Sequence, residues 1–210
     1  MKEIRQMEGY SSYGEWLRNG HHEWWRGVKM IGGGMNKAAQ ILIAELQTVF
    51  GDEEVKVAGG YARDLHYGRK SNDIDIFVHL GHDYGHSEAF KEAKWICRVA
   101  RNRGFTVEVS QAYELEAEHP DGIDECTFSA RHWAIAQLEF GDLSIDVLFT
   151  KSEDIFETLR TFDVNLNQAY LRDGTAVWPY GIPTELKQLK ELPPGRAEKM
   201  QGIAREVGLK

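Results

Sequence analysis

The sequence is poor in cysteine and has no long apolar segment. The two cysteines, Cys97 and Cys126, lie far apart and form no Cys-x-x-Cys pair. This spacing argues against a zinc knuckle or a disulfide framework and favours a reducing compartment. No apolar run approaches the roughly 20 residues that a membrane span requires, and the polar N-terminus lacks the apolar core of a signal peptide. We therefore expect a cytoplasmic protein that makes no membrane contact.

Positive charge is also scarce. The 25 Lys and Arg residues are outnumbered by 33 Asp and Glu residues, which gives a formal net charge of −8. A protein that grips a long nucleic acid by its phosphates usually presents a broad basic surface. The composition argues against extended binding of duplex DNA, so any contact with nucleic acid should be confined to a few nucleotides.

The 210 residues suit one domain with two appendages. We predict an aromatic-rich N-terminal arm at 1–34, a main domain at 35–180 and a short helical tail at 181–210. Two interpretations of the arm remain open. Its aromatic rings either pack onto the main domain or form a platform on which unpaired bases stack.

Apolar periodicity and turn residues predict alternating helices and strands. Helices are expected at 36–50, 61–67, 87–103, 153–160, 184–189 and 196–207, and strands at 55–58, 74–78, 105–109, 132–140 and 143–149. Gly141-Asp142 joins the last two strands as a hairpin, and Ser152 is expected to cap the helix that follows. This pattern predicts an α+β domain built on one mixed sheet of about five strands flanked by helices.

The segment 57–78, VAGGYARDLHYGRKSNDIDIFV, is the most informative part of the chain. Asp73 and Asp75 lie two positions apart at the start of a predicted strand, so their side chains project from the same face. Two such carboxylates suit a pair of divalent cations about 3.5–4 Å apart that clamp a phosphoryl group during its transfer. An isolated Asp-x-Asp pair is more often a solvated strand edge, so the neighbouring residues decide its meaning.

Those neighbours favour a phosphate ligand. Gly59 and Gly60 end one strand and open a short helix, where bare backbone can approach phosphates. Arg63 and Lys70 follow closely and are expected to neutralise a triphosphate.

The combined pattern resembles the DNA-polymerase-beta-like nucleotidyltransferase superfamily, in the branch that contains bacterial CCA-adding enzymes and poly(A) polymerases. The matching residues are Gly59, Gly60, Arg63, Asp64, Gly68, Asp73 and Asp75. The resemblance implies a polymerase-beta-like palm that moves a nucleoside monophosphate from a nucleoside triphosphate to an acceptor hydroxyl and releases pyrophosphate. It also implies two Mg²⁺ ions, with Mn²⁺ as an alternative, bound by Asp73, Asp75 and a third carboxylate on a later strand.

Asp146 is the best candidate for that third catalytic and metal-binding carboxylate, because it interrupts an apolar strand. Asp142 and Glu139 are weaker candidates, and a solvent-facing strand position is the other interpretation of Asp146.

Within TFDVNLNQAYL, Asp163 and Asn167 resemble part of a second family motif that positions the nucleotide. Both family arginines are replaced there, by Thr161 and Phe162, and Arg160 is a possible substitute. The predicted nucleotide-binding residues are Gly59, Gly60, Arg63, Asp64, Lys70, Asp163 and Asn167.

Three hypotheses about function stay open. The first is transfer to an RNA or tRNA 3′ end, which the expected lack of the further helical domains that hold tRNA in related enzymes weighs against. The second is modification of a protein or a small molecule, as in toxin–antitoxin systems. The third is a non-catalytic nucleotide-binding module, which the intact Asp73 and Asp75 disfavour. A zinc site at His79, His82 and His86 is a weaker hypothesis, because no cysteine or acidic ligand completes a recognisable pattern.

Overall fold

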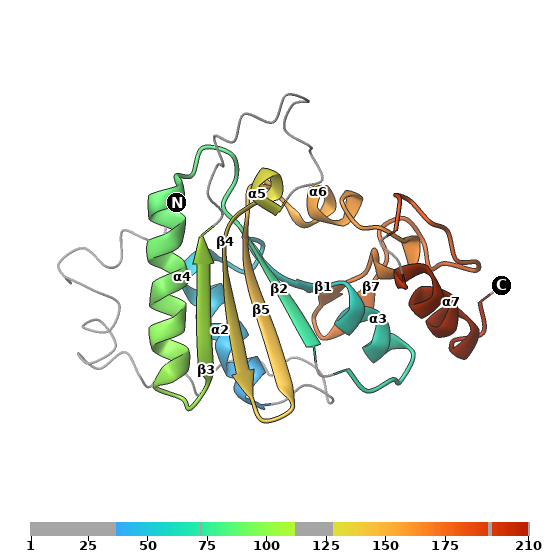
Figure 1. Ribbon diagram of the computed structural model, residues 1–210, viewed down its shortest axis with the longest axis horizontal. Coiled ribbons are helices and arrows are strands. Elements are labelled where there is room, and N and C mark those ends of the chain that lie inside the picture. The colour runs from blue at the N-terminus through green and yellow to red at the C-terminus, as the bar shows by residue number, and fades with distance from the viewer. Residues whose placement is uncertain (1–36, 72, 112–127, 193–194, 210) are drawn as a thin grey trace.

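The computed structural model describes residues 37–71, 73–111, 128–192 and 195–209 (Figure 1). The predicted arm at 1–34 lies outside the described residues. The described part of the chain contains no helix long and apolar enough to cross a membrane.

Helices and strands alternate along the chain much as the sequence predicts. The helical segments are α2 (Lys37–Phe50), α3 (Gly60–His66), α4 (His86–Arg101), α5 (Phe128–Arg131), α6 (Ile155–Arg160), a 3-10 turn (Asn165–Asn167) and α7 (Arg196–Glu206). The strands are β1 (Val55–Ala58), β2 (Asp73–His79), β3 (Thr106–Gln111), β4 (His132–Phe140), β5 (Leu143–Thr150), β6 (Tyr170–Arg172) and β7 (Thr175–Val177).

The seven strands form one mixed sheet in the order β3-β4-β5-β2-β1-β6-β7. Only β2 and β5 pair in parallel, and the other neighbours are antiparallel. The α+β class with a mixed sheet is therefore confirmed. The sheet has two more strands than expected, because β6 and β7 are each three residues long and too short for a periodic pattern.

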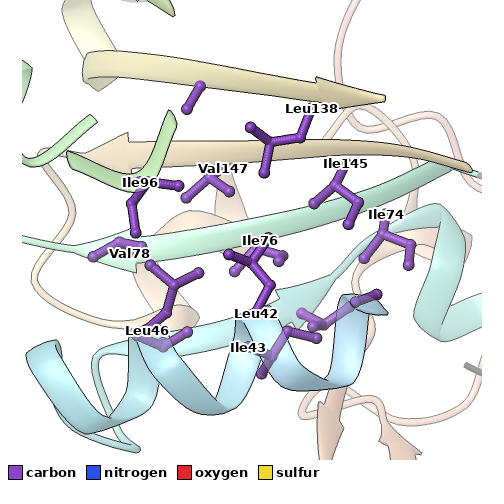
Figure 2. Close-up of a cluster of buried hydrophobic side chains, with 14 of the residues drawn as sticks. Leu42, Ile43, Leu46, Ile74, Ile76, Val78, Ile96, Leu138, Ile145 and Val147 are labelled. Carbon is purple, nitrogen blue, oxygen red and sulfur yellow. The ribbon is translucent and has the colours of Figure 1, made fainter. Parts of the chain in front are cut away.

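One face of the sheet carries the main apolar core. Figure 2 shows side chains of α2 pointing toward those of β2 and β5, and α4 covers β3 and β4 on the same side of the fold (Figures 1 and 2). Ile74 and Ile76 of β2 are 1% and 0% exposed. Burying such a side chain contributes about 1.5–3 kcal/mol. The alternation of β2 thus places its isoleucines in the core and leaves its aspartates on the other face.

The opposite face is covered only in part. A smaller apolar cluster joins β2 and α6 through Phe77, Ile155 and Leu159, and in a third cluster α7 packs against the 3-10 turn.

The helix cap of α6 differs from the expectation. Asp154, not Ser152, is the N-cap, since its Oδ1 accepts a hydrogen bond from Glu157 N at 2.8 Å. The aspartate lies one residue before the helix, where its carboxylate can reach the free N–H groups.

The expected helix at 184–189 does not form. Gln188 instead makes an isolated antiparallel bridge with Val164. Asn165 fixes this extended segment, because its amide donates to Glu185 O at 3.0 Å and its Oδ1 accepts from Lys187 N at 2.8 Å. Tertiary hydrogen bonds therefore override the local helix preference of this segment.

Candidate functional site

Three aspartates lie on the less covered face of the sheet. The parallel register pairs Asp75 of β2 with Asp146 of β5, and Asp73 with Ser144. Residues paired across a parallel ladder project to the same side, as do residues two apart on one strand. Asp73, Asp75 and Asp146 therefore share one face, close to the start of β2.

The electrostatics of this face reflect the crowding of negative charge. The pKa of Asp75 is raised to about 6, first by burial and then by the charges of Asp146 and Asp73, while Arg196 acts in the opposite direction. The pKa of Asp146 is also raised, first by burial, and Asp73 adds to this effect. Gln137 of β4 opposes it by donating a hydrogen bond to Asp146 Oδ1 at 3.4 Å. The ionised forms of both carboxylates are thus penalised unless a cation is near.

The chemistry of these donors suits a hard divalent cation. Carboxylate oxygens are the ligands that Mg²⁺ prefers. Within the described ranges, however, no three His, Cys, Asp or Glu side chains are gathered closely enough to hold a metal ion in their present positions.

The two weaker candidates for the third carboxylate lie elsewhere. Asp142 occupies the exposed turn between β4 and β5. Glu139 is an exposed residue of β4 that pairs with Ser144. Of the three candidates, Asp146 is the residue that the register places beside Asp75.

The Gly59-Gly60 turn approaches this face closely. Gly59 adopts φ 79° and ψ −137°, a conformation that residues with a Cβ atom rarely adopt, and its N–H donates to Ala169 O at 2.8 Å. A Cβ atom on Gly59 would lie 3.4 Å from Asp75 Oδ2 and 3.5 Å from a ring carbon of Phe162. Bare backbone, a carboxylate and an aromatic ring therefore surround the same small space.

Arg63 lies in a different place from the one expected of a triphosphate ligand. Its side chain is buried, and its guanidinium forms two hydrogen bonds with Asp64, both 2.8 Å long. A third hydrogen bond, 2.6 Å long, joins it to Asn167 Oδ1. Arg63 and Asp64 thus brace the turn from inside the protein, and the guanidinium is not directed at an open site.

Asp163 and Asn167 belong to the same polar network. Asn167 Nδ2 donates to Asp163 Oδ1 at 3.5 Å, and Arg196 Nε of α7 donates to Asp163 Oδ2 at 2.7 Å. Burial alone would raise the pKa of Asp163, but the hydrogen bond and the charge of Arg196 lower it. The network links the turn after β1 to the C-terminal helix. The sequence did not single out Arg196, because 33 residues separate it from Asp163.

The remaining predicted residues differ in position. Lys70 is exposed in the connection between α3 and β2, whereas its neighbour Arg69 forms ion pairs with Asp64 and Glu206.

His79 is buried, and its ring nitrogens contact Glu54 O and Thr158 Oγ1. Burial is the main cause that lowers the pKa of His79.

The histidine hypothesis finds no support in this arrangement. His82 is exposed and lies 3.6 Å from a carboxylate oxygen of Glu157, while the ring of His86 packs against Trp133 with centroids 4.5 Å apart. The three histidines therefore have separate surroundings, and among the described residues they form no metal cluster.

Comparisons with known proteins bear on the fold. No family model and no curated protein matches the sequence. A solved structure of a tRNA-processing enzyme, apo form I, has a TM-score of 0.53 and 20% identity over 86% of this chain and 45% of that chain. Apo form 2 has a TM-score of 0.50 and 20% identity over 80% of this chain and 44% of that one.

A Thermotoga maritima CCA-adding enzyme complexed with tRNA is also similar, with a TM-score of 0.49 and 21% identity over 82% of this chain and 37% of that chain. The chain thus spans less than half the length of the solved structures it matches. The two apo structures establish that this chain has a fold found in a tRNA-processing enzyme, which agrees with the fold expected from the sequence resemblance.

Proposed function

We propose that this chain is a metal-dependent nucleotidyltransferase that moves a nucleoside monophosphate from a nucleoside triphosphate to an acceptor hydroxyl. The observation that carries the proposal is the register of β2 and β5, which brings Asp146 beside Asp75 on the face that also bears Asp73. The fold shared with a tRNA-processing enzyme supports it. The motif resemblance at residues 59–75 supports it independently.

Asp73, Asp75 and Asp146 would hold the ions, for which Mg²⁺ is the expected metal and Mn²⁺ the alternative. When bound, two such ions stabilise the charge on the transferring phosphoryl oxygens and activate the acceptor hydroxyl. The raised pKa of Asp75 fits this role, because a group whose ionised form is penalised gains most from a nearby cation.

The rest of the chain would orient the substrates. The bare backbone of Gly59 and Gly60 leaves room for the nucleotide beside Asp75. The exposed cations Lys70 and Arg160 are available for the phosphates. We assign Asp163 and Asn167 an indirect role, since they hold Arg196 and Arg63 in place. Asp146 would accept the proton of the acceptor hydroxyl.

The acceptor has two candidates. An RNA or tRNA 3′ end is favoured by the fold shared with a tRNA-processing enzyme. A protein or small molecule is favoured by the negative charge on β3 and β4, the strands next to the aspartate-bearing strands. There, Glu108 and Glu139 are exposed on β3 and β4, in the same register rows as Asp146 and Asp73, respectively. Such a surface repels a polyphosphate backbone, so we expect few RNA phosphates to be contacted.

Transfer assays test the proposal. Each labelled nucleoside triphosphate is incubated with the chain and Mg²⁺, and with total tRNA, whole-cell protein or a small-molecule extract. We expect label in one acceptor class only, and none when a chelator is added. A non-catalytic module would bind nucleotide and label nothing, which would contradict the proposal.

The salt dependence of tRNA binding separates the acceptors further. Each phosphate contact on a single strand adds about 0.7 to the slope of log affinity against log salt. A shallow slope fits contact with a few terminal nucleotides. A steep slope would require an extended basic surface, contrary to the composition.

A further inference from the structure

The side chain of Phe162 occupies an unusual position beside the carboxylates. Phe162 follows α6, and its ring packs against Phe77 with centroids 5.9 Å apart and planes tilted by 46°. Two ring carbons lie 3.5 and 3.7 Å from the point where a Cβ atom of Gly59 would be, and Asp75 Oδ2 lies 3.4 Å from the same point. The ring is only partly buried, so it contributes apolar surface to the space beside Asp75.

An uncharged ring at this place constrains what can bind there. Phosphates need cations or N–H donors, and a phenyl ring offers neither. Sugars and bases, in contrast, pack on aromatic rings through apolar and stacking contacts. The neighbouring Gly59 has no side chain to keep such a group away from the ring.

The support behind Phe162 favours a fixed orientation. The apolar cluster formed by Ala58, Phe77, Ile155, Leu159 and Tyr170 packs against the ring, so one part of it is anchored and another part remains accessible. A preformed aromatic surface costs little conformational entropy when a ligand binds.

We propose that Phe162 binds the nucleoside part of the substrate, with the phosphates extending toward Asp75. This inference rests on the proposed function, since it requires a nucleotide at the aspartate site. It assigns the two parts of one substrate to two surfaces: the carboxylate face takes the phosphates through metal ions, and the aromatic ring takes the sugar and base.

Binding of two probes to the full chain tests this assignment. The affinity for each of the four common nucleoside triphosphates and for inorganic tripolyphosphate is measured by calorimetry in the presence of Mg²⁺. Phe162→Ala should weaken binding of the preferred nucleotide about 5- to 150-fold, the range expected for loss of one stacking contact. Binding of tripolyphosphate, which has no nucleoside, should stay within about twofold of the wild-type value.

Matched variants separate the ring from the fold. Phe162→Tyr keeps the ring and should keep the affinity, whereas Phe162→Leu keeps apolar volume and should still lose nucleotide affinity at least threefold. Phe162→Leu carries the test if Phe162→Ala does not fold. Phe156→Ala is the control, because Phe156 is an exposed aromatic residue of α6 that packs against Tyr170.

Two results would overturn the inference while the proposed function stands. One is unchanged nucleotide affinity in Phe162→Ala and Phe162→Leu, and the other is an equal loss of affinity for nucleotide and for tripolyphosphate, which would indicate a structural role only. If the wild-type chain binds none of the four nucleotides with Mg²⁺, the proposed function fails and the inference fails with it.

Discussion

The residues of strand β2 are neighbours in the sequence, but the two faces of the strand lie in opposite environments. Ile74 and Ile76 are almost completely buried against the helices, whereas Asp73 is exposed and Asp75 is half-buried on the other face. On the covered face, burial of apolar area explains each residue type. On the other face lie three aspartates, and ionisation of Asp75 and Asp146 is opposed first by burial and then by neighbouring negative charge.

The comparison shows that stability explains the residue types on the covered face but not those on the other face. Apolar residues on the covered face stabilise the fold directly. Ionised Asp75 and Asp146 lower the stability of the fold, and a bound partner of opposite charge would remove that cost. A cation that binds the native state is the simplest such partner, and the predictions below compare the two faces on this basis.

The largest effect is expected from the aspartates. Asp73→Asn combined with Asp75→Asn should abolish nucleotidyl transfer in the labelled-acceptor assay, because neutral amides bind Mg²⁺ poorly. The fold should remain intact by circular dichroism, since the change relieves repulsion. Asp142→Asn is the matched control, because Asp142 is an exposed aspartate in the β4–β5 turn. Wild-type activity in the double variant would refute the metal hypothesis.

A large loss of stability is expected from the buried pair that braces the Gly59-Gly60 turn. Arg63→Ala leaves the buried carboxylate of Asp64 without its two hydrogen bonds from the guanidinium. Breaking such a pair costs about 3–5 kcal/mol, which urea unfolding would measure. Arg160→Ala, at an exposed arginine, should change the free energy of unfolding by less than about 0.5 kcal/mol. Equal effects of the two substitutions would show that Arg63 is not structural.

A smaller loss is expected at Gly59. Gly59→Ala should lower the free energy of unfolding by about 1–3 kcal/mol, because its φ and ψ suit glycine almost alone. The added methyl group would also fill the space between Asp75 and Phe162 and weaken nucleotide binding. Gly141→Ala provides the comparison, since Gly141 has φ 60° and nothing within 4 Å of its Cβ position. Nucleotide affinity should fall only in the Gly59 variant, and a loss in both would remove the steric explanation.

The smallest effect is a pH dependence of stability. Asp75 retains its proton up to about pH 6 in the native state, against a reference pKa of 3.8. The native state therefore binds more protons than the unfolded state between about pH 4 and 6, and the free energy of unfolding falls as the pH rises through this window. Solvent screening limits the size of the change. The difference between wild type and Asp75→Asn, measured by urea unfolding with a chelator, should shrink toward pH 4. A constant difference would contradict the raised pKa.

Much of the fold is predictable from the sequence, because its strongest patterns are local. The period-two alternation of β2 and the apolar face of α2 assign both elements within a few residues of their observed bounds. The short strands β6 and β7 are not predictable in this way, because they depend on pairing with β1 and with each other. The same limit explains the failed helix at 184–189, where the side chain of the distant Asn165 decides the conformation.

The candidate site was only partly predictable for the same reason. Asp73 and Asp75 share a face by alternation alone, so their relation follows from local sequence. The position of Asp146 beside Asp75 depends on a parallel register between distant strands. The environment of Arg63 depends on Asn167, which lies 104 residues away, so sequence proximity to the glycines suggested a phosphate ligand where the fold has an internal brace.

Binding of Mn²⁺, measured by electron paramagnetic resonance with and without nucleotide, tests the central claim most directly. Mn²⁺ is the probe because it is the spectroscopically visible alternative to Mg²⁺ at carboxylate sites. We predict that the wild-type chain and Asp142→Asn bind Mn²⁺ with the same affinity, and that Asp75→Asn and Asp146→Asn each lose most of it. Equal Mn²⁺ affinity in all four proteins would contradict the account, because the aspartates of β2 and β5 would then have no role in holding a metal ion.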